Sequence, residues 1–167
     1  MRIIKLGLIS VLVLFGIVTG IASLLPSHVR ISRAVDIDAR RAAIYPKLAE
    51  LKAWEGWNEF IRLYPNKHWE ADKLEADGIT ITVQQNTDSL VTAEWMQPSG
   101  TRFSSGYHII SYAPDSSRCT VQWYFDFHVG WYPWQKFQSI EYDQQFGPVM
   151  EKSLQNLQQQ VQSHNLQ

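Results

Sequence analysis

The hydrophobic pattern divides the chain into an uncharged apolar run and a longer stretch in which apolar and polar positions recur with strand and helix periods. The run covers Leu6 to Leu25 and contains no charged residue. At about 1.5 Å per residue, a helix of this length spans a hydrocarbon core roughly 30 Å thick. It predicts a single-pass anchor in the cell membrane over residues 1–26, followed by one folded domain over residues 27–167.

A cleaved signal peptide is the alternative interpretation of the same run. Arg2 and Lys5 form a basic amino-terminal region, and Gly20-Ile21-Ala22 has the small-x-small pattern of a cleavage site. The run is longer than the usual signal core of about 7 to 15 residues, which favours a retained anchor. The basic tail favours a domain outside the cytoplasm, although four arginines shortly after the run oppose that orientation.

The first part of the domain is predicted to be a strand followed by a helix. Apolar and polar residues alternate from His28 to Ile37, which is the period of a half-buried strand. Asp38 is expected to cap a helix over Ala39–Leu51, whose apolar residues form a stripe. Trp54 and Trp57 follow the end of this helix, and we expect both to fold back on the core.

Alternating runs joined by turn residues predict an antiparallel meander in the middle of the domain. The runs are Ile79–Val83, Leu90–Met96, Phe103–Tyr112 and Cys119–His128, with a weaker one near His68–Ala71. The turns fall at Asn86–Asp88, at Pro98–Gly100 and around Pro114-Asp115.

The carboxy-terminal part is predicted to be a long amphipathic helix. Apolar residues recur at three and four positions from Phe146 to Val161, and glutamines cover the opposite face. Pro148 is expected in the first turn of this helix, because proline is tolerated where no backbone donor is needed. Trp134–Tyr142 should form a separate or kinked helical piece before it.

Composition narrows the function classes. Fifteen lysines and arginines stand against 16 aspartates and glutamates, and Arg2 and Lys5 precede the apolar run, so the domain is net acidic. This balance gives no electrostatic footprint for nucleic acid. Cys119 is the only cysteine, which excludes an internal disulfide, and its strand position predicts a buried packing thiol.

The order of the predicted elements matches a known arrangement: a strand, a helix ending in paired tryptophans, a meander and a long final helix. The matching stretches are Leu25–Val29 leading into Arg33–Ala39, then Trp54–Asn58 and Phe146–Leu154. On these residues the chain resembles the SRPBCC or START-like superfamily, which includes the Bet v 1 type proteins and the bacterial polyketide cyclase/dehydrase-like family. The resemblance implies an α+β helix-grip fold, with a curved antiparallel sheet wrapped around the C-terminal helix and, here, one transmembrane helix in front.

The same resemblance implies an apolar cavity between sheet and helix, which in relatives holds lipids, steroids, polyketides or other hydrophobic ligands. Its motifs are structural, and none is catalytic. The candidate cavity residues of this chain are Arg33, Trp57, Trp95, Tyr107, Trp123, Phe125, Phe127 and Val149. Those on the strand 119–128 share one face, so they form either cavity wall or core.

Arg33 is the sharpest polar anomaly, because strand alternation places it among inward-facing apolar residues. A buried guanidinium needs partners, since desolvating it alone is costly. It either binds the carboxylate or phosphate head group of a ligand, or it forms a structural salt bridge or extends to water at the strand end.

Other chemistries lack sequence support. The five histidines show no metal-ligand spacing, so we predict no metal site, and His108 and His128 should be exposed on the outer strand face. Glycine-rich phosphate loops and nucleophile motifs are absent from the sequence, and no cofactor is predicted.

Two further segments have alternative interpretations. The run Trp131-Tyr132-Pro133-Trp134 either touches a bilayer interface or packs against the final helix. Gly16 and Gly20 have GxxxG spacing, which allows two anchors to approach closely and form a homodimer, although glycine is common in such helices.

Three functions remain open at this point. The leading hypothesis is a membrane-anchored domain that binds a hydrophobic small molecule or lipid. The alternatives are an enzyme of the polyketide cyclase or dehydratase type, in which Arg33 with Tyr107 or Glu94 would do acid and base work, and a structural or partner-binding domain with a filled core.

Overall fold

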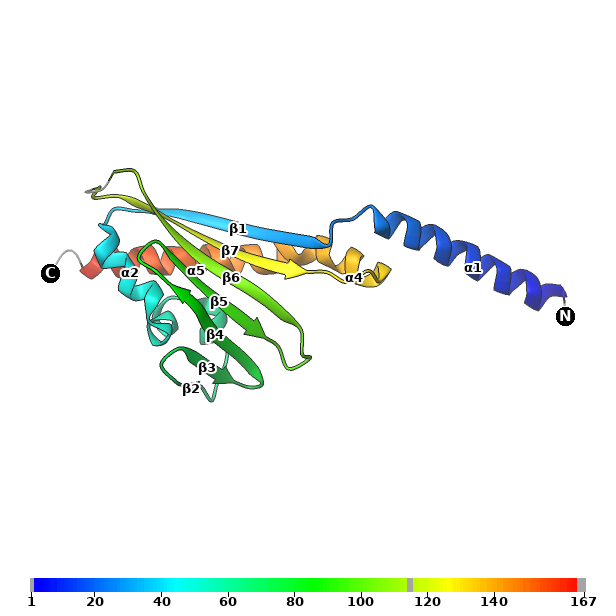
Figure 1. Cartoon of the computed structure of the whole chain (residues 1–167), viewed down its shortest axis with the longest axis horizontal. Coiled ribbons are helices and arrows are strands. Elements are labelled where there is room, and N and C mark those ends of the chain that lie inside the picture. Colours follow the sequence, from blue (N-terminus) through cyan, green and yellow to red (C-terminus); the bar gives the residue numbers. More distant parts are fainter. Residues whose placement is uncertain (1, 114–115, 165–167) are drawn as a thin grey trace.

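The computed structural model describes residues 2–113 and 116–164, so the predicted turn at Pro114-Asp115 lies outside the described residues. Helix α1 (Arg2–Ser23) projects from one end of a domain built from a sheet and a second long helix (Figure 1). The start of α1 and the carboxy-terminal end of the last helix, near His164, lie at opposite ends of the molecule (Figure 1). Among the described residues α1 is long and apolar enough to cross a membrane, and a signal sequence passes the same test.

Seven antiparallel strands form one curved sheet in the order β1-β7-β6-β5-β4-β3-β2. The strands are β1 (His28–Ile37), β2 (His68–Trp69), β3 (Lys73–Ala76), β4 (Ile79–Asn86), β5 (Leu90–Met96), β6 (Arg102–Ser111) and β7 (Cys119–His128). Strands β2 to β7 pair in chain order, which confirms the predicted meander, although strand β3 was not predicted. Strand β1 pairs with β7 along its whole length, with His28 opposite His128 and Ile37 opposite Cys119.

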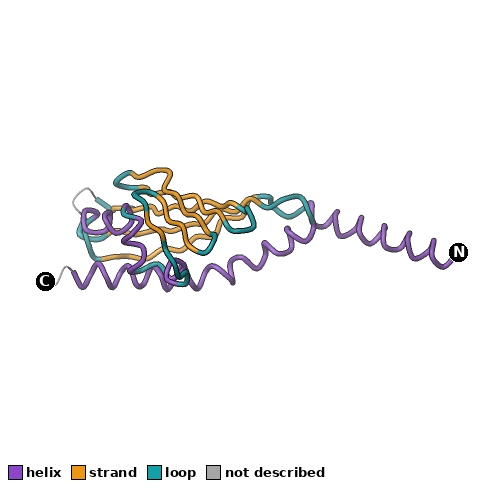
Figure 2. Tube along the Cα trace, turned by 90° about the horizontal axis from the view of Figure 1, so that it is seen from below, coloured by secondary structure: helices purple, strands orange, loops and turns teal. Residues whose placement is uncertain are grey.

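The remaining elements are helical and lie mainly on one face of the sheet. They are α2 (Arg41–Ala49), η1 (Leu51–Gly56), α3 (Glu59–Arg62), α4 (Pro133–Gln138), η2 (Ser139–Glu141) and α5 (Tyr142–His164). Helix α5 runs along the inner face of the sheet, next to β1 (Figure 2). This arrangement is the helix-grip fold, as predicted.

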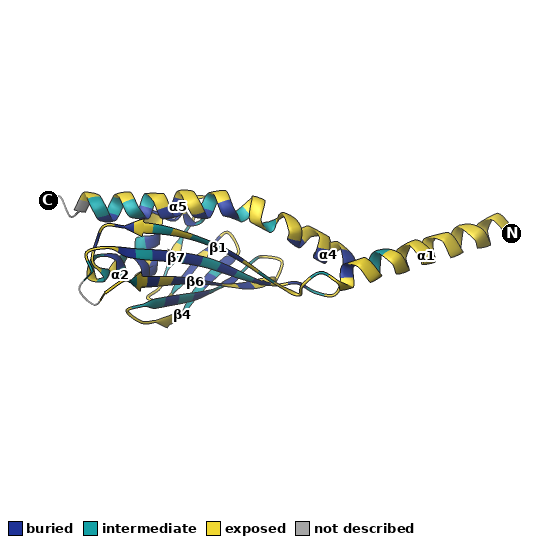
Figure 3. Cartoon of the chain, turned by 90° about the horizontal axis from the view of Figure 1, so that it is seen from above, coloured by how far each residue is buried: buried dark blue, intermediate teal, exposed yellow. Residues whose placement is uncertain are grey.

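The buried face of α5 is set by its sequence period. Met150, Leu154, Leu157 and Val161 are each at most 2% exposed, while Gln155 and Gln159 face water. Figure 3 shows this division along the helix. Because full burial of one leucine side chain stabilises a fold by about 1.5–3 kcal/mol, this stripe is what attaches α5 to the sheet.

Two local predictions were wrong. Asp38 does not cap α2: its carboxylate accepts a hydrogen bond from Arg118 Nε at 2.7 Å, and Arg40 occupies the N-cap position without a side-chain bond. Pro148 lies inside α5, not in its first turn, because the helix already begins at Tyr142. Both errors concern where a helix begins: α2 starts at Arg41, two residues later than expected, and α5 starts at Tyr142, several residues earlier.

Candidate functional site

The space between the sheet and α5 is occupied by a continuous cluster of aromatic rings, here called the aromatic interior. Its members are Trp54, Trp57, Phe60, Trp95, Phe103, Tyr107, Trp123, Phe125, Phe127, Tyr142 and Phe146. Neighbouring rings have centroids between 4.8 Å (Phe127 and Tyr142) and 6.4 Å (Phe103 and Phe146) apart. Such distances are typical of edge-to-face and offset pairs, so the rings pack directly against one another.

The rings come from both the sheet and the helices. Strands β6 and β7 place every second side chain inward, which brings Tyr107, Trp123 and Phe125 together. The short helix α3 inserts Phe60 at the centre, where its ring lies 5.8 Å from Trp123 and 5.6 Å from Phe125. Phe146 of α5 closes the other side, 5.8 Å from Phe60.

A few polar groups are buried with the rings. Asn58 Nδ2 donates to Tyr107 Oη at 3.2 Å, and Asn58 Oδ1 caps α3 by accepting from the backbone N–H of Phe60 at 3.0 Å. Burial raises the pKa of Tyr107 well above its usual value, so this phenol stays protonated. The indole N–H of Trp123 is also buried and has no hydrogen-bond partner among the described residues.

Most of the predicted cavity residues lie together. Trp57, Trp95, Tyr107, Trp123, Phe125 and Phe127 all belong to the aromatic interior. Val149 lies apart: it is half-buried and lines a surface hollow of about 260 Å³ between α3 and α5, together with Leu63 and Lys152. The inward face of α5 carries Phe146 and Met150, so Val149, the residue before Met150, points to a different side of the helix.

The sequence interpretation missed several members of the cluster. Phe60 lies in a helix of four residues, which is too short to show a period, and only the capping residue Asn58 marks its start. Tyr142 lies in the first turn of α5, although it was expected to end a separate helical piece, and Phe146 was predicted on the apolar face of the final helix but not among the cavity residues. The four-residue spacings from Tyr142 to Phe146 and from Phe146 to Met150 were the available signal.

Arg33 joins β1 to α5 instead of pointing into the aromatic interior. Its Nε lies 2.6 Å from Glu151 Oε1 and its Nη2 lies 2.9 Å from Asp143 Oδ1, and the hydrogen bond to Glu151 raises the pKa of the guanidinium. Its side chain is 25% exposed, and a Cβ at Gly147 would clash with its guanidinium. The geometry corresponds to the salt-bridge interpretation of Arg33.

The acid and base groups considered for an enzyme do not meet. Tyr107 points to the inner face of the sheet, whereas Glu94 lies on the outer face, where its carboxylate is 3.8 Å from Arg102. Arg33 is held at the sheet edge by α5. The three residues therefore do not converge on one point, which acid-base catalysis by them would require.

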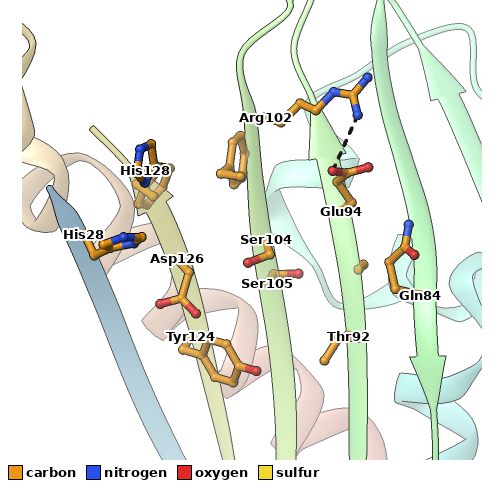
Figure 4. A pocket seen from close by; sticks show the side chains of 13 residues that line it. His28, Gln84, Thr92, Glu94, Arg102, Ser104, Ser105, Tyr124, Asp126 and His128 are labelled. Atoms are coloured by element: carbon orange, nitrogen blue, oxygen red, sulfur yellow. Dashed lines mark ion pairs between the residues drawn. The ribbon is translucent and has the colours of Figure 1, made fainter. Parts of the chain in front are cut away.

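A polar hollow of about 620 Å³ lies on the outer face of the sheet (Figure 4). The rings of His28 and His128 are 4.6 Å apart at one end of it, and both histidines are exposed. Asp126 is engaged by Arg30 in two hydrogen bonds of 2.6 and 2.7 Å. Since its carboxylates already have arginine partners, the hollow presents little unused charge to a ligand.

Comparison with known proteins agrees with this geometry. A family model described as "Polyketide cyclase / dehydrase and lipid transport" matches residues 28–162. No curated protein matches the chain.

Solved structures resemble the fold at low sequence identity. A Staphylococcus aureus protein of unknown function has a TM-score of 0.65 at 12% identity, covering 84% of this chain and 97% of its own. Norcoclaurine synthase from Thalictrum flavum, solved with dopamine and hydroxybenzaldehyde, has a TM-score of 0.58 at 13% identity, covering 86% and 92%. A START superfamily protein from Mycobacterium smegmatis has a TM-score of 0.54 at 18% identity, covering 80% and 97%.

The family match extends from the first strand almost to the end of α5, and the structural neighbours share the sheet and its helix. The chain therefore belongs to the polyketide cyclase/dehydrase and lipid transport family.

Proposed function

We propose that this protein is a membrane-anchored binding domain that takes an apolar small molecule or a lipid into the aromatic interior between the sheet and α5. The observation that carries the proposal is the unpaired indole N–H of Trp123 in a surrounding of aromatic rings. A buried donor without a partner costs about 1–3 kcal/mol. A mostly apolar ligand with one acceptor oxygen would remove that cost while its remaining surface contacts the rings.

Such a ligand needs room that the rings now fill, and α3 is the element whose displacement would provide it. Helix α3 has four residues, and its Phe60 ring lies at the centre of the cluster. It is held by polar contacts: the backbone N–H of Glu59 donates to Ser153 Oγ at 2.9 Å, and Asn156 Nδ2 donates to the Glu59 carboxylate at 2.7 Å. Displacing α3 would break these contacts and the ring contacts of Phe60, and the contacts of the ligand with the remaining rings would offset that cost.

Two further facts support the proposal. Helix α1 has an apolar surface suited to lipid, which would keep the domain beside a source of hydrophobic ligands. The similarity to norcoclaurine synthase indicates that the fold accommodates small aromatic molecules in that protein. The boundary between residues 26 and 27, a domain outside the cytoplasm and a homodimer through Gly16 and Gly20 stay predictions.

The test is native mass spectrometry of the full chain extracted from membranes in mild detergent. We expect a co-purifying apolar molecule, and we expect Trp123→Phe to reduce its retention by about tenfold, because the hydrogen bond is lost while one aromatic ring stays at this position. Trp69→Phe, in the edge strand β2, is the matched control and should retain the ligand. If both variants and the native chain carry no bound molecule, the filled-core alternative is correct instead.

A further inference from the structure

The end of the domain beside α1 carries a group of exposed aromatic and aliphatic side chains, here called the juxtamembrane patch. Its members are Trp131, Tyr132, Trp134, Phe137 and Ile140, with exposed fractions between 40% and 67%. They lie on α4, on η2 and on the turn that follows β7. Exposed apolar side chains gathered in one place are unusual on a soluble surface and mark a contact with a partner or a membrane.

The patch is rigid. The ring of Tyr132 stacks on Trp131 at 4.4 Å and on Trp134 at 4.6 Å between centroids. Pro133, between these rings, is buried at the start of α4. A preformed aromatic surface loses little conformational freedom when it is covered.

The patch is also fixed relative to the end of α1. The side chain of Lys136 is buried, and its Nζ donates to the backbone oxygen of Leu25 at 3.0 Å and to Ser27 Oγ at 2.8 Å. Ala22, in the last turn of α1, is 1% exposed, and α1 contacts α4. Helix α4 is thereby clamped to the segment that joins the apolar helix to the domain.

We infer that the juxtamembrane patch inserts into the interfacial layer of the same bilayer that α1 spans. The inference rests on the proposed function in taking α1 as a membrane span. The 22 residues of α1 extend about 33 Å, so its last turn reaches the boundary between hydrocarbon and head groups. Tryptophan and tyrosine are the residues that favour this layer, and the patch presents both at that depth.

The consequence concerns the proposed binding site. Helix α5 starts at Tyr142, directly after the patch, and the rings of Tyr142, Phe146 and Phe127 form the nearest end of the aromatic interior. With the patch in the interface, that end lies at the lipid surface. A hydrophobic ligand would then pass between bilayer and domain without crossing water.

The test measures tryptophan quenching by brominated lipid. The full chain is reconstituted into phosphatidylcholine vesicles whose acyl chains carry bromine near the head group, which quenches only indoles in contact with lipid. Trp131 and Trp134 are 67% and 59% exposed, whereas Trp54, Trp57, Trp95 and Trp123 are buried. We expect the quenched fraction of the fluorescence to fall by more than half in the double variant Trp131→Phe, Trp134→Phe, since both lipid-facing indoles are removed.

Controls separate this inference from the anchor itself. Trp69→Phe should leave the quenched fraction unchanged, because β2 lies at the far edge of the sheet. In one outcome, the chain stays in the vesicles after an alkaline carbonate wash while the double variant and the native chain are quenched equally. This result overturns the interfacial position of the patch but not the anchor. Release by the wash overturns the anchor and this inference together. A second copy of the chain could cover the patch instead of lipid. In that case quenching would be absent at one chain per vesicle, and the patches of two chains would cross-link at high density. This result would also overturn the inference.

Discussion

Helices α1 and α5 have almost the same length, 22 and 23 residues, and face different surroundings. Helix α1 is apolar on every side and, among its described residues, buries only Ala22. Helix α5 is apolar along one stripe and polar elsewhere, and that stripe lies on the sheet (Figure 3). The difference shows what each pattern is suited to: an apolar stripe attaches a helix to a protein core, whereas a helix that is apolar on all sides suits full burial in a protein or a membrane.

The strongest way to break this comparison is a charge on the buried stripe of α5. Leu157→Asp should unfold the domain, because an unpaired buried charge costs several kcal/mol, comparable to the whole free energy of unfolding. Circular dichroism of the detergent-solubilised chain should show no cooperative melt. If Leu157→Asp melted like the native chain, the assignment of the buried face of α5 would be wrong.

The same change on α1 should act on the membrane and spare the domain. Leu12→Asp places a carboxylate at the middle of the apolar helix, which costs about 2.5–3.5 kcal/mol of insertion free energy. We expect a smaller membrane-bound fraction after carbonate washing and an unchanged melting temperature of the domain. A lowered melting temperature would mean that α1 packs on the domain and does not face lipid.

Arg33 tests how far ion pairs contribute to holding α5 on β1. Arg33→Met should lower the stability by about 1 kcal/mol, because its partners Asp143 and Glu151 are more than half exposed and return to water. Thermal melts in low and high salt measure the effect, and the native chain should lose the same small increment in high salt. A loss of bound ligand without a change in melting would instead restore Arg33 as a head-group ligand.

Glu59 gives the attachment of α3 to α5 a pH dependence. A hydrogen bond from Asn156, followed by the charges of Lys152 and Arg62, lowers the pKa of Glu59. A lowered folded-state pKa adds stability above the ordinary glutamate pKa of about 4.3, and this stability is lost as the pH falls through the folded value. Glu59→Gln should therefore melt earlier than the native chain near neutral pH.

The two melting curves should converge in acid, since the native carboxyl is then protonated as well. Melting temperatures measured from neutral to acidic pH provide the check. A difference that persists below the folded pKa would show that the side chain acts through its shape and not through its charge.

The smallest effect is expected on the wet face of α5. Gln155→Asp should change the stability by no more than about 0.5 kcal/mol, because Gln155 is exposed. Urea denaturation of Gln155→Asp and Leu157→Asp compares the stability lost on the exposed and on the buried face of the same helix. Similar losses from both substitutions would mean that the polar face is covered by an unseen neighbour.

The regular elements could be predicted from the sequence because each shows its own period over many residues. Alternation located β1, β5 and β7 almost to the residue, and the recurrence from Phe146 to Val161 located the buried face of α5. The same alternation placed Trp123 and Phe125 on one inward face. Strand alternation also predicted that His108 and His128 are exposed and that Cys119 is buried, and the structure confirms these positions.

Short elements and element ends were decided by tertiary contacts. Helix α3 is too short to show a period, and the fold places its Phe60 among rings from β5, β7 and α5. Helix α5 begins before Pro148 because Tyr142 and Phe146 pack on Phe127. This packing compensates for the helical hydrogen bond that Pro148, which has no backbone N–H, does not make.

The sequence by itself determined which faces are apolar, the family and the presence of a helix long and apolar enough to cross a membrane. The tertiary structure decided what each face meets. It paired Arg33 with two carboxylates of α5, separated Glu94 from Tyr107 on opposite sides of the sheet, and clamped the patch around Trp131 and Trp134 to the end of α1 through Lys136. The physical reason is that a hydrophobic period depends on neighbouring residues of one segment, whereas a contact depends on distances between segments far apart in the chain.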